Sequence, residues 1–405
     1  MRTCLFRALS QAMQVRSMHN GPRAVEEVPM PLDSLELRTS LQRVLVGLIL
    51  ILVPLTVFGF YVALQGDSQI RQMAGENIRS VTRTSAEFTS QFIAGPVRDV
   101  SVIANDPSLE QAVLAANHQY ERLSDDIVLS KAAAIEQKWN NSEGDALARN
   151  ILASDLARQL RRMRELNPGL LKVTVADASG ATVAATDKPV HYFQTDRGYW
   201  AVLYSQGQGA IHVADLRYDE QNRLPYISIA YPILQESTGR FIGAVTALID
   251  VSPLFVQLNR QQTGRTGRLF LVRDDGTVIQ APGVTPSMKI HSEEYSAIRD
   301  SLGNLRGRET GYLFTTFPKG EKYLVGFADV GLKDAFPNLP WIVVASQEER
   351  EITGPIRNVA AFALFVMILS LLMLSVLAAY VFLHRVQKLE DIETPPEDKP
   401  RPSAA

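Results

Sequence analysis

Arginine, aromatic and acidic side chains lie close together in two short segments of this 405-residue chain. The first segment is YFQTDRGYW, Tyr192–Trp200, and the second is RYD, Arg217–Asp219. An arginine guanidinium matches a carboxylate through two parallel hydrogen bonds, an aromatic ring supplies an apolar wall, and a buried ammonium group needs a carboxylate close by. Side chains of these types could together hold a small ligand that carries a carboxylate.

Common catalytic signatures are absent from the sequence. It has no G-x-S-x-G, no G-x-x-x-x-G-K and no H-E-x-x-H, and its one cysteine, Cys4, cannot form an intramolecular disulfide. The 41 Lys and Arg against 43 Asp and Glu leave no surplus of positive charge for nucleic acid. Several histidines between the apolar stretches described next lack the spacing of metal ligands: His118, His191, His212 and His291. We therefore expect no catalysis, no metal, no cofactor and no nucleic-acid partner.

Two stretches without a charged residue are long enough to cross a membrane as helices, 44–64 and 359–383. A buried core helix seldom runs so far without a polar face, and a cleaved signal peptide would start nearer the N-terminus. Basic residues flank the two stretches on their outer sides: Arg2, Arg7, Arg16, Arg23, Arg38, Arg43, Arg385, Lys388, Lys399 and Arg401. This bias predicts a two-pass protein of the inner (cytoplasmic) membrane, with tails 1–43 and 384–405 in the cytoplasm and the middle periplasmic or extracellular.

The middle of the chain shows a helical pattern followed by strand patterns. Apolar residues recur at helical intervals from Ile70 to Phe92, and Gly95-Pro96 is expected to interrupt that helix. From Leu170 the pattern changes to strands, with a hairpin turn that ends at Gly180. Further strands are expected at 209–213, 225–234 and 240–249.

The strand arrangement then begins again near Thr263. GRLFLVRDDGTVIQAP repeats the plan of LKVTVADASGATVAAT, with Gly276 closing the turn in place of Gly180. A helix around 292–302 and strands at 311–316, 322–328 and 341–346 should follow. We expect residues 65–262 to form the long helix with a membrane-distal unit, and residues 263–350 to form a membrane-proximal unit.

This ordered set of segments resembles the double-Cache family of extracytoplasmic sensor domains. The segments that show the resemblance are 192–200 (YFQTDRGYW), 218–232 (YDEQNRLPYISIAYP), 241–254 (FIGAVTALIDVSPL), 263–282 (TGRTGRLFLVRDDGTVIQAP), 323–327 (YLVGF) and 339–347 (LPWIVVASQ). The resemblance implies an α+β fold, in which a long N-terminal helix carries two stacked PAS-like antiparallel-sheet units, here flanked by two transmembrane helices. It also implies a receptor that binds a ligand and takes part in signal transduction.

Amino-acid-binding members of the family carry a Tyr, four residues, an Arg, one residue and a Trp-Tyr pair, followed by Tyr-x-Asp and a later Asp. In this sequence Tyr192 and Arg197 match at that spacing. Tyr199 and Trp200 fill the aromatic pair in reversed order, and Asp219 stands at the Asp of Tyr-x-Asp. The resemblance therefore implies that these residues line the pocket of the distal unit.

Two positions depart from the family pattern. Arg217 replaces the second Tyr, and Leu248 replaces the later Asp that holds the ligand's ammonium group. Asp250 lies two residues from Leu248, on the same face of the expected strand, and could take over that role. Because Arg197 and Arg217 together favour an anion, we expect a carboxylate-bearing ligand, either an amino acid or an organic acid.

A purely structural role remains the alternative for these side chains. Arg197 could form an ion pair with Asp196 or Asp215, and Tyr192 and Trp200 could be core aromatics. In that case the pocket is vestigial, and the chain is an envelope module that binds another protein.

Family members commonly continue after the second span into a kinase, cyclase or chemoreceptor module, whereas here the tail reads TPPEDKPRPSAA. We therefore expect the signal to pass to a separate cytoplasmic or membrane signalling protein. The helix from Ile70 to Phe92 could support a homodimer through a parallel seam.

Overall fold

The computed structural model describes residues 34–120, 122–195, 198–261, 263–284, 290–302 and 309–393. They divide into two compact units, and the larger one, Gly59–Leu369, contains every described strand. The smaller unit holds the outer ends of the two terminal helices, α1 (Ser34–Ala104) and α9 (Glu349–Glu393). Each of these helices includes a segment long and apolar enough to cross a membrane, Ile49–Ala104 and Arg357–Tyr380.

Helix α1 continues through Gly95 and Pro96 to Ala104, so the predicted interruption at these residues is wrong. A proline inside a helix costs about 3 kcal/mol. On either side of it Ile93 and Val100 are fully buried in the largest hydrophobic core. Burial of such side chains is worth about 1.5–3 kcal/mol each, which offsets that cost.

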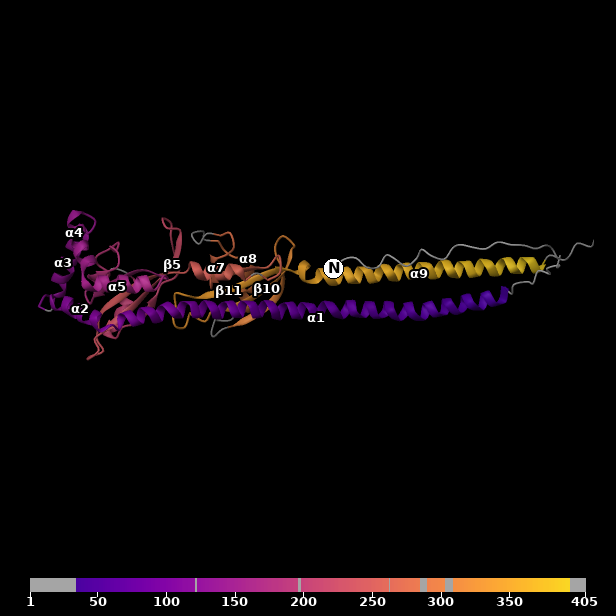
Figure 1. The fold of residues 1–405 in the computed structure, drawn as a ribbon, viewed down its shortest axis with the longest axis horizontal. Coiled ribbons are helices and arrows are strands. Elements are labelled where there is room, and N and C mark those ends of the chain that lie inside the picture. The colour runs from indigo at the N-terminus through magenta and orange to yellow at the C-terminus, as the bar shows by residue number, and fades with distance from the viewer. Residues whose placement is uncertain are drawn as a thin grey trace, which may run out of the picture. The chain divides into compact units, whose positions relative to one another are not determined.

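Four helices follow α1: α2 (Pro107–His118), α3 (Asp125–Lys138), α4 (Ser142–Ala153) and α5 (Asp155–Leu166) (Figure 1). Side-chain caps begin several of them. The Asp106 carboxylate accepts from the Ser108 amide at 2.8 Å to begin α2, and Ser154 accepts from the Ala157 amide at 3.1 Å to begin α5. Leu109 of α2 and Leu160 of α5 pack into the same core as α1.

The distal sheet contains β1 (Leu170–Asp177), β2 (Thr182–Ala185), β3 (His212–Val213), β4 (Arg217–Asp219), β5 (Leu224–Leu234) and β6 (Phe241–Asp250). All described pairs are antiparallel, in the order β2-β1-β6-β5-β3, and β4 also pairs with β5. The short helix α6 (Trp200–Tyr204) and the 3-10 turn η1 (Ser205–Gly207) precede β3. Helix α7 (Ser252–Arg260) follows β6 and leads toward the next sheet.

The proximal sheet contains β7 (Arg268–Arg273), β8 (Val278–Gln280), β9 (Thr310–Thr316), β10 (Lys322–Asp329) and β11 (Trp341–Glu348). Its antiparallel order is β8-β7-β11-β10-β9. Helix α8 (Glu293–Ile298) and the 3-10 turn η2 (Arg299–Ser301) lie between β8 and β9 in sequence. Strand β11 runs directly into α9.

One hydrophobic core joins α1 to both sheets. It includes Ile78 of α1, Val245 of the distal sheet and Val343 of the proximal sheet, all fully buried. At Gly326 the helix approaches the proximal sheet so closely that a Cβ would lie 2.9 Å from Cγ2 of Ile78. In Figure 1 the indigo ribbon of α1 accordingly passes beside β10 and β11 and reaches the distal helices.

The structure confirms the predicted fold class, α+β with a long N-terminal helix, two antiparallel sheets and an apolar helix at each end. The two predicted hairpin turns are also present. Gly180 and Gly276 have φ values of +86° and +84°, a backbone conformation that favours glycine, and each ends the turn between the first two strands of its sheet.

Candidate functional site

The distal sheet has one apolar face and one polar face. Ile227, Ile229 and Val245 point toward α1 and are fully buried. Side chains alternate along a strand, so the residues between these point to the opposite side. We call this opposite side the polar face, and its half-buried or exposed members on the central strands are Lys172, Thr174, Tyr226, Ser228, Thr246, Leu248 and Asp250.

Three strands place a cation, a phenol and a carboxylate in one row of the polar face. Arg217 of β4 is opposite Tyr226 of β5, and Tyr226 is opposite Asp250 of β6. Directly paired side chains of antiparallel strands stand on the same face with Cβ atoms about 5 Å apart. The guanidinium and the carboxylate therefore bracket the tyrosine at about 10 Å between their Cα atoms, two strand spacings apart.

A second row of the polar face lies next to the first. Lys172 is opposite Leu248, and Leu248 is opposite Ser228. Leu248, which departs from the family pattern, thus stands between an ammonium group and a hydroxyl group. A third row, Thr174 opposite Thr246 opposite Ala230, adds two more hydroxyl groups.

Helix α6 and the residues before it cover one end of the polar face. Trp200 is buried against Ala230 and Ala244, and its ring meets that of Phe241 edge-on at 5.8 Å. The ring of Tyr199 lies 5.8 Å from the ring of His212. Since His212 pairs with Ala230 across β3 and β5, Tyr199 reaches the polar face beside the third row.

His212 lies between the ring of Tyr199 and the positive charge of Arg217 in the first row. Burial lowers the pKa of His212 below its usual 6.5, and the positive charge of Arg217 lowers it further. The imidazole is therefore neutral at pH 7, and the ring can donate or accept a hydrogen bond without adding charge.

Two of the carboxylates also stabilise local backbone. Asp219 accepts from the amides of Gln221 and Asn222 and from Nδ2 of Asn222, at 3.0, 3.1 and 2.8 Å, and the Asn222 side chain is the main reason that its pKa is lowered. Asp250 Oδ1 accepts from the Ser252 amide at 2.7 Å, just before α7. A carboxylate has about four acceptor positions, so both groups keep capacity for a ligand.

Tyr192 lies in a different part of the unit. Its buried ring packs at 5.3 Å on Trp139, the residue that follows α3, in a cluster with Ala148 and Ala181. Burial raises the pKa of its hydroxyl group, and the negative charge of nearby Asp177 acts in the same direction. This environment is that of a core aromatic residue.

The predicted site residues therefore divide into three groups. Tyr199, Arg217 and Asp250 lie on the polar face, Tyr199 beside the third row and the other two in the first. Asp219 ends β4, just before the turn to β5. Tyr192 and Trp200 occupy hydrophobic clusters. Arg197 and Asp196 lie outside the described residues. Asp215, the other proposed ion-pair partner of Arg197, binds Arg273 of the proximal sheet at 2.6 Å and accepts from the Trp341 indole at 3.1 Å.

Sequence reasoning did not identify several polar-face residues, Lys172, His212, Tyr226 and Ser228. The signal for two of them was present in the alternation of LPYISIA, where Tyr226 and Ser228 interrupt a run of buried residues at every second position. Lys172 and His212 come from strands far away in sequence, and only the pairing of β1 and β3 with their neighbours brings them to this face.

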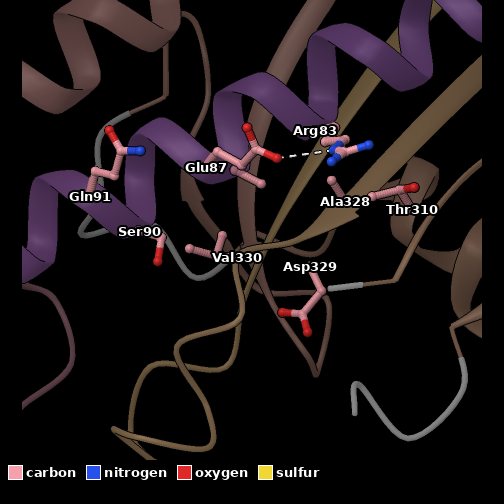
Figure 2. A pocket seen from close by; sticks show the side chains of 9 residues that line it. Arg83, Glu87, Ser90, Gln91, Thr310, Ala328, Asp329 and Val330 are labelled. Atoms are coloured by element: carbon pink, nitrogen blue, oxygen red, sulfur yellow. Dashed lines mark hydrogen bonds and ion pairs between the residues drawn. The ribbon is translucent and has the colours of Figure 1, made fainter. Parts of the chain in front are cut away.

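A groove of about 550 Å³ lies elsewhere, between α1 and the ends of β9 and β10 (Figure 2). Arg83 and Glu87 project from α1 on one side of it and form an ion pair, with Nε 3.0 Å from Oε1. Asp329 and Thr310 lie on the opposite side. None of the predicted site residues that the structure describes lines this groove, so it is separate from the polar face.

Among the described ranges, no group of three or more His, Cys, Asp or Glu is placed to hold a metal ion.

A family model matches this region, and solved structures are similar to it. The Cache domain family model, dCache_1, matches residues 67–356. The sensory domain of the Campylobacter jejuni chemoreceptor Tlp3 is similar at 13% identity, covering 71% of this chain and 98% of that one, with a TM-score of 0.45. The ligand-binding domain of the Pseudomonas fluorescens chemoreceptor CtaA, solved with L-isoleucine, is similar at 14% identity, covering 71% and 97%, with a TM-score of 0.40. No curated protein matches the chain in sequence.

Proposed function

Since the chain belongs to the Cache-domain family, we propose that it is a membrane-anchored sensor that binds a small carboxylate-bearing ligand, an amino acid or an organic acid, on the polar face of the distal unit. The observation that carries the proposal is the row formed by Arg217, Tyr226 and Asp250. It presents a group for an anion and a group for a cation on one partly solvent-accessible surface.

The cationic end of the row suits the ligand's carboxylate. Arg217 offers a planar fork of donors that binds a carboxylate through two bonds. Lys172 adds a second positive charge in the neighbouring row, and Tyr199 with the neutral His212 provides an aromatic wall beside it. Arg197, from the family pattern, is a further candidate for binding the ligand's carboxylate.

The acidic end of the row decides between the two ligand classes. An amino acid needs a carboxylate for its ammonium group, and Asp250 provides one two residues after Leu248, on the same face of β6. An organic acid has no such need. Asp250→Asn should therefore weaken the binding of an amino acid at least about tenfold and leave the binding of an organic acid nearly unchanged.

The remaining parts of the chain fit a two-pass receptor. We propose membrane helices at 44–64 and 359–383, tails 1–43 and 384–405 in the cytoplasm, a distal unit 65–262 and a proximal unit 263–350 outside. The exposed apolar surface of the two terminal helices supports this arrangement. Ligand binding would shift the population between two arrangements of the domain, to the extent that its affinity for them differs, and a signalling protein would detect the change.

A thermal-shift screen of the purified full chain in a mild detergent tests the proposal. The ligands are the common amino acids and small di- and tricarboxylic acids. A ligand at 100 times its Kd stabilises the folded state by about 2.7 kcal/mol, which raises the melting temperature by several degrees. Arg217→Gln should abolish the rise, whereas Arg122→Gln, a matched change at an exposed arginine of the α2–α3 connection, should preserve it.

The alternative is an envelope module that binds another protein and has a vestigial pocket. The two departures from the family's ligand-binding pattern favour it, Arg217 in place of a Tyr and Leu248 in place of an Asp. If no carboxylate raises the melting temperature, the sensor proposal is contradicted and this second function gains support.

A further inference from the structure

The proximal unit contains a cavity of about 490 Å³ on the face of its sheet that points away from α1. The ends of β10 and β11, the first turn of α8 and the β9–β10 hairpin surround it. The apolar part of the same face is covered by α8, through Tyr295 and Ile298. The cavity thus occupies the part of the sheet face that α8 leaves uncovered.

This position corresponds to the polar face of the distal sheet. The strand orders β2-β1-β6-β5 and β8-β7-β11-β10 match strand for strand. Tyr226 opposite Asp250 in the distal sheet has its equivalent in Tyr323 opposite Glu348 in the proximal sheet. One row further on, Lys172 opposite Leu248 has its equivalent in Arg268 opposite Ser346.

The repeated arrangement differs from the distal one at several positions. Thr315 is opposite Tyr323 where the distal sheet has Arg217 opposite Tyr226, and Val325 is opposite Ser346 where the distal sheet has Ser228 opposite Leu248. Ser346 provides a hydroxyl group where the distal sheet has Leu248, and it donates to Glu294 of α8 at 3.2 Å. The proximal cavity therefore combines a phenol, a cation, a hydroxyl group and two carboxylates, Glu294 and Glu348, from four separate elements.

The charge of the lining favours a positive ligand. Four of the described lining residues are glutamates and three are Arg or Lys. None of the four glutamates forms an ion pair with another described residue. Burial raises the pKa of the Tyr323 hydroxyl group, and the negative charges of Glu321 and Glu348 raise it further.

An aromatic wall stands beside these carboxylates. Phe317 stacks on Tyr323 with 4.7 Å between the ring centroids. The face of an aromatic ring attracts a cation, most strongly where water is excluded. Carboxylates beside such a wall form the combination that recognises an organic ammonium group with an apolar body.

We propose that this cavity is a second ligand site, separate from the distal one, and that it takes a small primary amine. Glu348 and Glu294 hold the ammonium group, and the apolar part of the amine packs on Phe317. Glu348 is the residue immediately before α9, so an occupant of the cavity would touch the start of the helix that leads out of the domain.

Saturation-transfer NMR tests the proposal with the full chain in phosphatidylcholine nanodiscs. The probe is propylamine hydrochloride, and propionate, its carboxylate counterpart, is the control ligand. The wild-type protein should transfer saturation to propylamine and much less to propionate. Glu348→Gln should weaken propylamine binding at least about tenfold, because it removes a charged hydrogen-bond acceptor. Glu143→Gln, the same change at an exposed glutamate of α4, should have no effect.

Two further variants keep the result interpretable. Phe317→Leu removes the aromatic ring without changing the charge and should weaken propylamine binding several-fold. This variant therefore tests the proposal if Glu348→Gln fails to fold. Arg217→Gln, which removes the distal site, should leave propylamine binding intact. The proposal is overturned if propylamine does not bind, if propionate binds as well, or if folded Glu348→Gln and Phe317→Leu both bind propylamine like the wild type.

Discussion

Glu351, in the first turn of α9, holds the loop from which the proximal sheet begins. Its carboxylate accepts from the amides of Arg265 and Thr266 at 2.7 and 2.9 Å and from the Thr266 hydroxyl group at 2.5 Å. These bonds, first of all the one from the Thr266 hydroxyl group, lower the pKa of Glu351 from 4.5 to about 2. Replacement by Gln removes the charge and keeps the shape, so Glu351→Gln measures what the charged group contributes.

The expected loss of stability follows from the pKa. The drop from 4.5 to about 2 would correspond to about 3 kcal/mol at 1.36 kcal/mol for each pKa unit. The Glu351 side chain is 16% exposed, so solvent screens its charge. We therefore reduce the expected loss of stability to about 1–2 kcal/mol. For a domain of this size that corresponds to a melting temperature about 2–6 °C lower.

The pH dependence identifies the cause of the loss. Because the pKa of Glu351 is lower in the folded protein, the unfolded state binds the proton more readily. The contribution is therefore complete above pH 4.5 and disappears as the pH falls toward 2. Tryptophan fluorescence of the full chain in detergent, heated at several pH values from 7 to 3, should show the difference between wild type and Glu351→Gln shrinking with acid.

The control is Glu143→Gln, at an exposed glutamate paired with Lys138, for which we expect less than 1 °C. The reasoning is refuted if Glu351→Gln melts like the wild type at pH 7. It is equally refuted if the variant stays destabilised by the same amount at pH 3.

Three further predictions concern the core and the polar face. Trp139→Ala should destabilise the chain by about 3–5 kcal/mol in urea unfolding, since the fully buried ring leaves a large cavity; a loss below 1 kcal/mol would show that the site collapses. Gly326→Ala places a methyl group against Ile78 and should cost about 1–3 kcal/mol in the same assay, and an unchanged urea midpoint would argue against the close approach of α1. His212→Asn should make the melting temperature depend less on pH between pH 7 and 5. The folded pKa of His212 lies below 6.5, so its contribution to wild-type stability is complete above pH 6.5 and is lost as the pH falls through the folded pKa. Equal pH dependence of the melting temperature in the two proteins would contradict this.

Most of the architecture could be predicted from the sequence because it depends on local patterns. The hairpin turns at Gly180 and Gly276 require a positive φ, and the strands on either side alternate or run as apolar segments. The end of α1 could not be predicted. Whether a helix tolerates Pro96 depends on what its flanking residues bury, and that information lies in partners distant in sequence.

The candidate site could be predicted only in part, for a similar reason. The alternation of β6 placed Asp250 on the same face as Leu248. Tyr192 has the residue type expected of a ligand wall, and its ring packs on Trp139, the residue that follows α3. Residue type alone does not separate a ligand contact from a core contact. The row that joins Arg217 to Asp250 depends on the register of three strands, which no single segment of sequence specifies.

Hydrogen–deuterium exchange of the full chain, with and without a carboxylate ligand that raises its melting temperature, tests the central claim most directly. Binding at the polar face should slow exchange in His212–Val213, Arg217–Asp219, Leu224–Leu234 and Phe241–Asp250, the strands that carry or flank the row from Arg217 to Asp250. Protection confined to the proximal sheet, or a ligand that protects Arg217→Gln as well as the wild type, would contradict the account.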